Sequence, residues 1–132
     1  MKKLILFIAV CTLASCTSEK LDITAAIKTA ESAIKLIGDK KYDELVKLYT
    51  SDFSSSETKE VREKKYNQII DIVGPAVEYI LTDSIRQNNT EEESRIVLKY
   101  NVKHERVNTT ETYTIVKEEG KYLLADIFIT NK

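Results

Sequence analysis

Beyond residue 20, the first half of the chain repeats its apolar residues with the period of an α-helix. From Ile23 to Ile37, isoleucine and alanine recur at spacings of four and three, which places them on one face of a helix over residues 22–37. Asp22 is suited to cap the first turn of this helix, and Gly38 is suited to end the last one. One amphipathic helix is therefore predicted here.

Two further helices are predicted before the pattern changes. An apolar stripe predicts a helix over about residues 40–52, joined to the first helix by a short connection. A less regular stripe predicts a third helix over about residues 57–73, opened by a capping box of Ser54 and Glu57. The pair Gly74-Pro75 ends this helix, because proline cannot continue the backbone hydrogen bonds.

After the proline the period of the apolar residues becomes two, as in β-strands. Four strands separated by turn residues are predicted over about residues 77–86, 96–104, 112–116 and 121–130. In the last strand we expect Leu123, Ala125, Ile127 and Ile129 on one face and Tyr122, Leu124, Asp126 and Phe128 on the other. Helices followed by a meander of strands predict an α+β fold, with the helices packed on one face of a four-stranded antiparallel sheet.

The first sixteen residues carry a different signal. Lys2 and Lys3 precede an uncharged run over residues 4–13, which is typical of a secretory signal peptide. That run is shorter than the roughly 17–25 residues that a bilayer-spanning helix requires. The small residues Ala14 and Ser15 then lead to Cys16.

The run Leu13-Ala14-Ser15-Cys16 resembles the lipobox of bacterial lipoproteins. The resemblance implies that residues 1–15 are a signal peptide cut before Cys16, that residues 16–21 are a lipidated tether, and that residues 22–132 form the domain. It also implies a diacylglycerol and a further acyl chain such as palmitate on Cys16, which together suffice for lasting membrane attachment. Thr17 differs from the Asp of inner-membrane retention signals, so the resemblance favours the outer membrane of the bacterial cell envelope.

The order of elements, together with the run Gly120-Lys121-Tyr122-Leu123-Leu124-Ala125-Asp126, resembles the cystatin-like cone fold of the nuclear transport factor two-like superfamily. That resemblance covers about residues 22–130 and implies a curved sheet that wraps the helices and leaves a cavity at the open end of the cone. Members use this cavity for catalysis, for ligand binding or not at all, so the fold does not decide the function.

Composition removes several classes of function. The net charge of −1 argues against a nucleic-acid partner. No metal site or cofactor is predicted, because the chain has one histidine and three glycines, and the acidic run over residues 91–93 lacks the ligand spacing of a calcium loop.

A few side chains are candidates for chemistry. Asp126 and Asp83 interrupt apolar strand faces and could meet in the cavity as an acid or base, with a tyrosine as partner. The candidates to line a ligand pocket are Tyr66, Tyr79 and Tyr100. His104, the only histidine, is a weaker catalytic candidate, because its place at a strand end favours an exposed side chain.

These observations favour a membrane-anchored envelope lipoprotein that binds a partner protein or a small ligand without catalysis. One alternative is a small isomerase- or hydrolase-like enzyme that uses a cavity carboxylate and a tyrosine. Another is an immunity-type or assembly factor that binds one partner.

Overall fold

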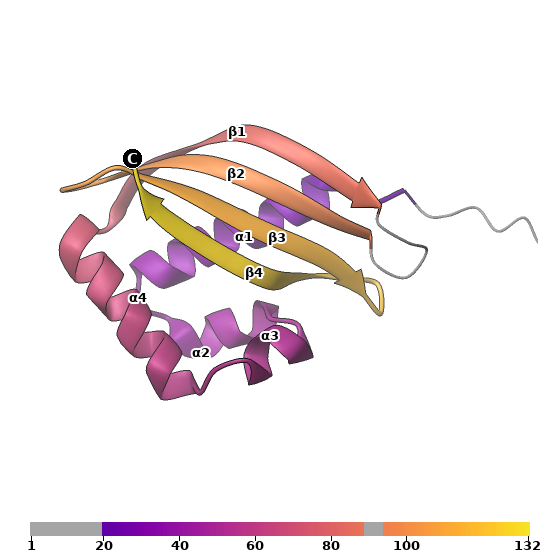
Figure 1. Ribbon diagram of the computed structural model, residues 1–132, viewed down its shortest axis with the longest axis horizontal. Helices are drawn as coiled ribbons and strands as arrows, with labels where there is room; N and C mark the ends of the chain where they lie inside the picture. The colour runs from indigo at the N-terminus through magenta and orange to yellow at the C-terminus, as the bar shows by residue number, and fades with distance from the viewer. Residues whose placement is uncertain (1–19, 89–93) are drawn as a thin grey trace, which may run out of the picture.

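The computed structural model describes residues 20–88 and 94–132. Within these ranges the elements are α1 (Ile23–Gly38), α2 (Tyr42–Leu45), the 3-10 turn η1 (Val46–Leu48), α3 (Ser51–Ser55), α4 (Lys59–Val73), β1 (Ala76–Asn88), β2 (Ser94–His104), β3 (Thr109–Glu118) and β4 (Lys121–Asn131). The strands form one antiparallel sheet in the order β1-β2-β3-β4. Figure 1 shows the helices on the concave side of this curved sheet, so the predicted α+β fold is confirmed. The predicted signal peptide and the predicted lipidation site Cys16 lie outside the described residues, as do residues 89–93.

Helix α1 forms as predicted. The Asp22 carboxylate accepts hydrogen bonds from the backbone N–H groups of Thr24 (2.9 Å) and Ala25 (3.4 Å), which satisfies two free donors of the first turn. The buried face of α1 is mostly alanine and isoleucine: Ala26, Ala30, Ala33, Ile34 and Ile37. Small side chains on this face allow the helix to lie close against the sheet. Among residues 20–88 and 94–132, no helix combines the length and the apolar character needed to cross a membrane.

The single helix predicted over residues 40–52 is wrong, because α2, η1 and α3 replace it. Tyr49 and Thr50 between them are extended and lie along the edge of β4. Tyr49 forms a parallel bridge with Leu124, and the Thr50 N–H donates to the Leu124 carbonyl oxygen at 2.9 Å. This long-range pairing takes the two residues out of the helical conformation, and the Thr50 side chain then caps α3.

The start of α4 also differs from the prediction. The residue that caps it is Thr58, whose hydroxyl oxygen accepts from the Val61 N–H at 3.3 Å, and the capping box of Ser54 and Glu57 does not form. The end is as predicted. Gly74 follows the last turn with φ of 83°, a conformation that glycine adopts without strain.

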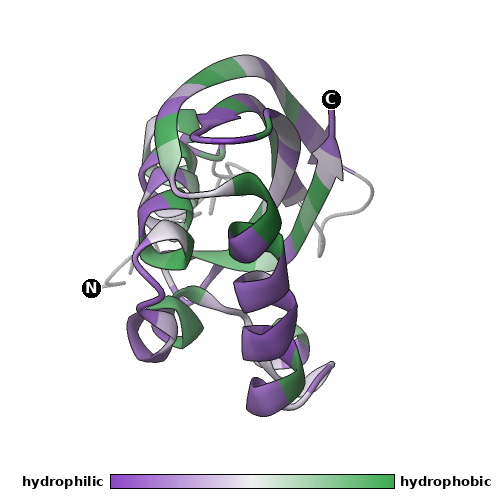
Figure 2. Ribbon diagram, turned by 90° about the vertical axis from the view of Figure 1, so that its left-hand side faces the viewer, coloured by the Kyte–Doolittle hydropathy of each residue, from purple (hydrophilic) through white to green (hydrophobic). Residues whose placement is uncertain are grey.

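Shifts in register change which residues face the helices. The pairing of β1 shifts between Ala76 and Glu78 and again between Leu81 and Asp83, and that of β4 shifts beside Ala125. Residues after each bulge therefore change faces, which the strict alternation expected from the sequence does not include. Leu124 is fully buried on the same face as Ile127 and Ile129, not on the opposite face as predicted, while Phe128 is 62% exposed on the outer face. Figure 2 shows the resulting bands of hydrophobic and hydrophilic residues along the strands.

Candidate functional site

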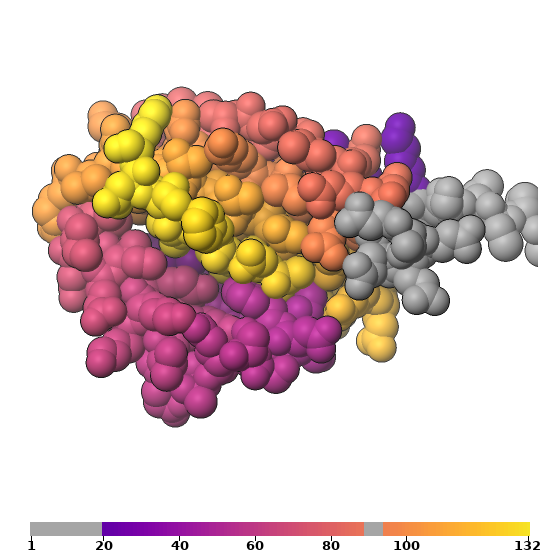
Figure 3. Space-filling model, viewed as in Figure 1, coloured from indigo at the N-terminus to yellow at the C-terminus, as the bar shows by residue number. Residues whose placement is uncertain are grey.

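A groove of about 450 Å³ runs between helix α4 and the edge strand β4. Its volume lies within the range of about 300–1,000 Å³ that is usual for ligand sites. The residues that line it come from α3, α4, β4 and the loop between the helices: Phe53, Ser56, Glu57, Arg62, Lys65, Tyr66, Ile69, Asp126, Ile127 and Ile129. Figure 3 shows the hollow between β4, in yellow, and the magenta helices.

The floor of the groove is apolar and owes its position to the bulge in β4. Ile127 and Ile129 pair across the sheet with Tyr113 and Glu111, whose side chains are buried on the inner face. Opposite residues of paired strands share a face, so both isoleucine side chains are on the helix side of the sheet. Ile69 of α4 forms the facing wall, and the groove is therefore suited to an apolar group.

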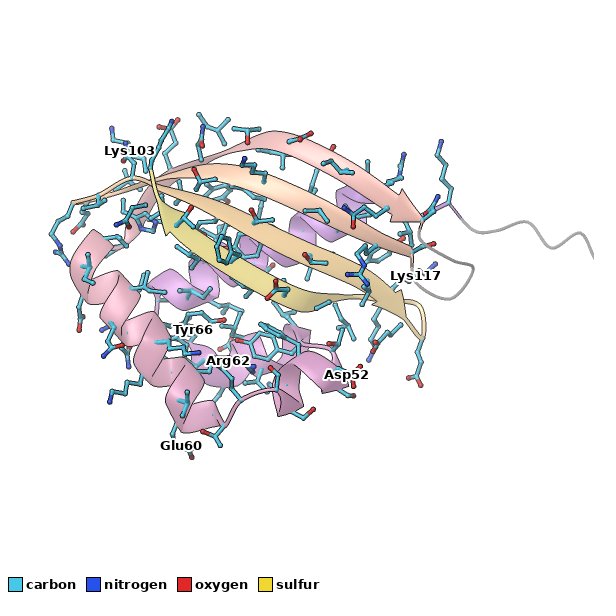
Figure 4. All side chains as sticks on the ribbon, viewed as in Figure 1. Asp52, Glu60, Arg62, Tyr66, Lys103 and Lys117 are labelled. Carbon is cyan, nitrogen blue, oxygen red and sulfur yellow. The ribbon has the colours of Figure 1, made fainter. Side chains whose placement is uncertain are left out.

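Arg62 is the central polar residue of the helical wall, although only 6% of it is exposed. Its guanidinium lies over the rings of Phe53 (4.4 Å) and Tyr49 (4.9 Å). Nη2 donates to the Phe53 carbonyl oxygen (2.5 Å) and to the Ser56 hydroxyl (2.9 Å), and Nε lies 3.6 Å from Glu57 Oε2. These contacts tie the chain between α3 and α4 to helix α4, on which Figure 4 labels Arg62.

The Glu57 carboxylate contacts both cationic side chains of this wall, those of Arg62 and Lys65. Lys65 Nζ donates to its Oε1, and this hydrogen bond lowers the pKa of the Glu57 carboxyl below its usual value. The charges of Arg62 and Lys65 are balanced by those of Glu57 and of Asp126 across the groove, so the four charged groups that line the groove sum to zero.

Of the three tyrosines proposed to line a pocket, the structure places only Tyr66 on the groove. Its hydroxyl lies 3.4 Å from that of Tyr49, and burial raises its pKa far above the ordinary tyrosine value. Tyr100 instead lies in the core, where the partly buried Tyr79 packs edge to face against it with ring centroids 6.2 Å apart. The Tyr100 hydroxyl is buried without a hydrogen-bond partner among the described residues.

The two aspartates considered as catalytic groups do not meet. Asp83 lies on β1 and Asp126 on β4, the opposite edges of the sheet, and both are exposed. Asp126 Oδ1 accepts a hydrogen bond from the N–H of the next residue, Ile127, at 2.9 Å. Asp126 does share the groove with Tyr66, but no contact joins the two side chains among the described interactions.

His104 is buried, so the expected surface position is wrong. Its Nδ1 lies 2.8 Å from the Gly74 carbonyl oxygen, and its Nε2 lies 3.0 Å from the Thr109 hydroxyl and 3.1 Å from Glu111 Oε1. Tyr113 donates its hydroxyl hydrogen to Glu111 Oε2, and the carboxylate raises the pKa of Tyr113 further than burial alone does. We call His104, Thr109, Glu111 and Tyr113 the buried network.

The geometry of the buried network fixes the hydrogen of one ring nitrogen. A carbonyl oxygen only accepts, so Nδ1 of His104 carries a hydrogen. Thr109 Oγ1 lies 2.9 Å from Glu111 Oε1 and 3.0 Å from His104 Nε2, so its hydroxyl hydrogen can serve either neighbour. Each member of the network has at least one hydrogen-bond partner.

Sequence reasoning missed Glu111, because the third strand was predicted to start after it. The signal is the alternation itself, which continues from Ile115 and Tyr113 back through Glu111 to Thr109. A carboxylate at such an inward position needs donors nearby, and the neighbouring strand supplies His104.

The buried network has no room for a substrate. The cavity beside His104 and Glu111 has a volume of about 10 Å³, which is at most the space of one water molecule. Ile69 and Ile129 line both this cavity and the groove, and so stand between them. The arrangement is that of a structural network that ties Gly74, at the end of α4, to β2 and β3.

No protein-family model matches the chain, and no curated protein is similar to it in sequence. Solved structures are similar in fold. A protein of unknown function with a cystatin-like fold from Nostoc punctiforme is 14% identical, with a TM-score of 0.61 over 86% of this chain and 93% of that one. A putative scytalone dehydratase from Novosphingobium aromaticivorans is 12% identical, with a TM-score of 0.52 over 83% of each chain.

The beta subunit of a benzoate 1,2-dioxygenase from Burkholderia mallei is 11% identical, with a TM-score of 0.53 over 86% of this chain and 93% of that one. At these identities the similarity shows the fold alone. The chain has the cystatin-like α+β fold, whose examples here include an enzyme, an enzyme subunit and a protein of unknown function.

Proposed function

We propose that this chain is a lipid-anchored protein of the bacterial cell envelope whose domain binds a ligand or partner in the groove between α4 and β4, without catalysis. The observation that carries the binding role is the groove itself: about 450 Å³ with an apolar floor and a charged rim. Its polar groups are already paired with one another or with backbone, as expected for a site that holds a molecule and does not transform it.

A catalytic role has weaker support. It would use the Glu111 carboxylate with Tyr113 or His104, which are in contact but enclosed behind Ile69 and Ile129. A substrate in the groove would reach them only if those two isoleucines moved.

The anchor is tested by metabolic labelling with radioactive palmitate. The whole chain should incorporate label and sediment with membranes, whereas Cys16→Ser should do neither, since the serine hydroxyl cannot form the thioether. A labelled Cys16→Ser product, or an unlabelled whole chain in the soluble fraction, would overturn the anchor.

The groove is tested with the full chain in detergent micelles and a library of small organic fragments and short peptides, followed by isoleucine methyl NMR. Binders should shift the methyl signals of Ile69, Ile127 and Ile129 together. The variant Ile127→Trp should fill the groove and weaken these binders at least about tenfold, roughly 1.4 kcal/mol. Phe128→Trp is the matched control, because residue 128 lies on the outer face of the same strand. Binders whose affinity is unchanged by Ile127→Trp would show that the groove is not the binding site.

A further inference from the structure

Beyond Leu124, the edge of β4 that borders the groove pairs with no other strand among the described residues. Lys132 N–H donates toward β3, to the Asn108 carbonyl oxygen at 3.3 Å, whereas Ile127 N–H donates to the Asp126 side chain. Backbone groups of successive residues alternate in direction along a strand, so those of Ile127 and Ile129 point away from β3. Because these residues also line the groove, the Ile129 N–H and the carbonyl oxygens of Ile127 and Ile129 lie along it.

The chain itself shows that this edge accepts an extended segment. Tyr49 and Thr50 run parallel to β4 and bond to the Leu124 carbonyl oxygen through the Thr50 N–H. Helix α3 begins at Ser51 and takes the chain away, so this added segment stops before Ile127. The edge that continues beyond it borders the groove.

An edge strand facing a helix across a groove is an arrangement that recognises extended peptides. The strand supplies main-chain hydrogen bonds, and the groove takes alternate side chains of the peptide. Here α4 supplies the facing wall with Ile69 and Tyr66, and Phe53 closes one end.

Resting on the proposed function, we propose that the occupant is an extended apolar segment of a partner protein that pairs with the Ile129 N–H and with the carbonyl oxygens of Ile127 and Ile129. The edge from Ile127 to Asn131 is about 14 Å long at roughly 3.4 Å per residue, which matches a peptide segment of about five residues. The charged groups of the groove sum to zero, so alternate apolar residues, and not a net charge, should be what the site selects.

The probe is a library of random peptides displayed on phage and selected against the full chain in detergent micelles. Selected peptides should share apolar residues at positions two apart, and one synthesised peptide then serves for measurement. On binding, the amide hydrogen of Ile129 should exchange with solvent at least about tenfold more slowly, as a newly bonded amide does. The Ile127 amide, which already donates to Asp126 Oδ1, is not expected to change in this way.

Two variants at one position separate backbone pairing from side-chain contact. Ile129→Pro removes the edge N–H but no ladder hydrogen bond, a placement that edge strands tolerate. Ile129→Ala loses most of the same side chain and keeps the N–H. We expect Ile129→Pro to bind the peptide at least about tenfold more weakly than Ile129→Ala, or roughly 1.4 kcal/mol. If Ile129→Pro does not fold, amide exchange in the unaltered chain decides whether the peptide pairs with the backbone of β4.

The failures of the two proposals are distinguishable. If Ile127→Trp blocks binding but the Ile129 variants bind equally and the Ile129 amide is not protected, the groove binds a ligand without strand pairing and only this inference is overturned. If Ile127→Trp leaves binding unchanged, the groove is not the site and both proposals are overturned. Selection of small fragments but no peptide also overturns the peptide assignment.

Discussion

Two tyrosines with the same burial should respond in opposite directions to the same substitution. Tyr100 and Tyr113 lie on neighbouring strands, are both fully buried, and pack edge to face with ring centroids 5.9 Å apart. The Tyr113 hydroxyl donates to the Glu111 carboxylate, whereas the Tyr100 hydroxyl has no partner among the described residues. Replacing each with phenylalanine removes one oxygen and keeps the ring.

The magnitudes follow from hydrogen bonding. A hydrogen bond to a charged group contributes about 1.5–3 kcal/mol, so Tyr113→Phe should lower the free energy of unfolding by about 2 kcal/mol. A buried hydroxyl without a partner costs about 1–3 kcal/mol, so Tyr100→Phe should raise the free energy of unfolding by about 1 kcal/mol. The two variants should therefore differ by about 3 kcal/mol, or on the order of 12 °C in Tm for a domain of this size.

Urea unfolding of the two variants and the unaltered chain, followed by far-UV circular dichroism, measures the difference. Equal slopes against urea would show that the comparison reports stability and not a change in the unfolded state. If Tyr100→Phe destabilises the domain as much as Tyr113→Phe does, the Tyr100 hydroxyl has a partner and the reasoning is wrong.

Three further predictions concern the buried network, the tyrosines and the first helix. Glu111→Ala should lower the free energy of unfolding by about 3–5 kcal/mol, because it leaves buried hydrogen-bond partners unpaired. Glu111→Gln should lower it by only about 1 kcal/mol, because the amide can donate to His104 and accept from Tyr113. Urea unfolding of both variants measures these changes. Burial raises the pKa of Tyr66 and of Tyr113 above 10.0, so their contribution to stability is complete below that pH. Above it, stability should fall by about 1.4 kcal/mol per pH unit for each tyrosine, because only the unfolded chain ionises; unfolding measured across this range, with tyrosinate absorbance, tests the sign. Asp22→Ala should lower stability by about 1 kcal/mol through loss of the helix cap, and an unchanged Tm would contradict the capping role.

Elements whose signals are local were predictable from the sequence. Helix α1 has its cap, its apolar face and its glycine within one stretch of chain, and the Gly74-Pro75 stop of α4 is equally local. The meander of strands follows from short turns and a period of two. The fold class depends on these features alone.

Features set by distant contacts were not predictable. The break at Tyr49 and Thr50 exists because β4, more than seventy residues later, offers a backbone partner. The bulge at Ala125 reverses the alternation and moves Ile127 and Ile129 to the groove. His104 is buried because Glu111, Thr109 and Gly74 satisfy its ring, and no local pattern around His104 contains that information.

The Asp126 carboxylate bears on whether the edge of β4 could join another copy of the domain. Exposed strand edges favour growth of one sheet into the next. Asp126 already occupies the amide of Ile127, and stacking two edges together would strip water from that carboxylate. This side chain therefore discourages assembly of the domains into fibres.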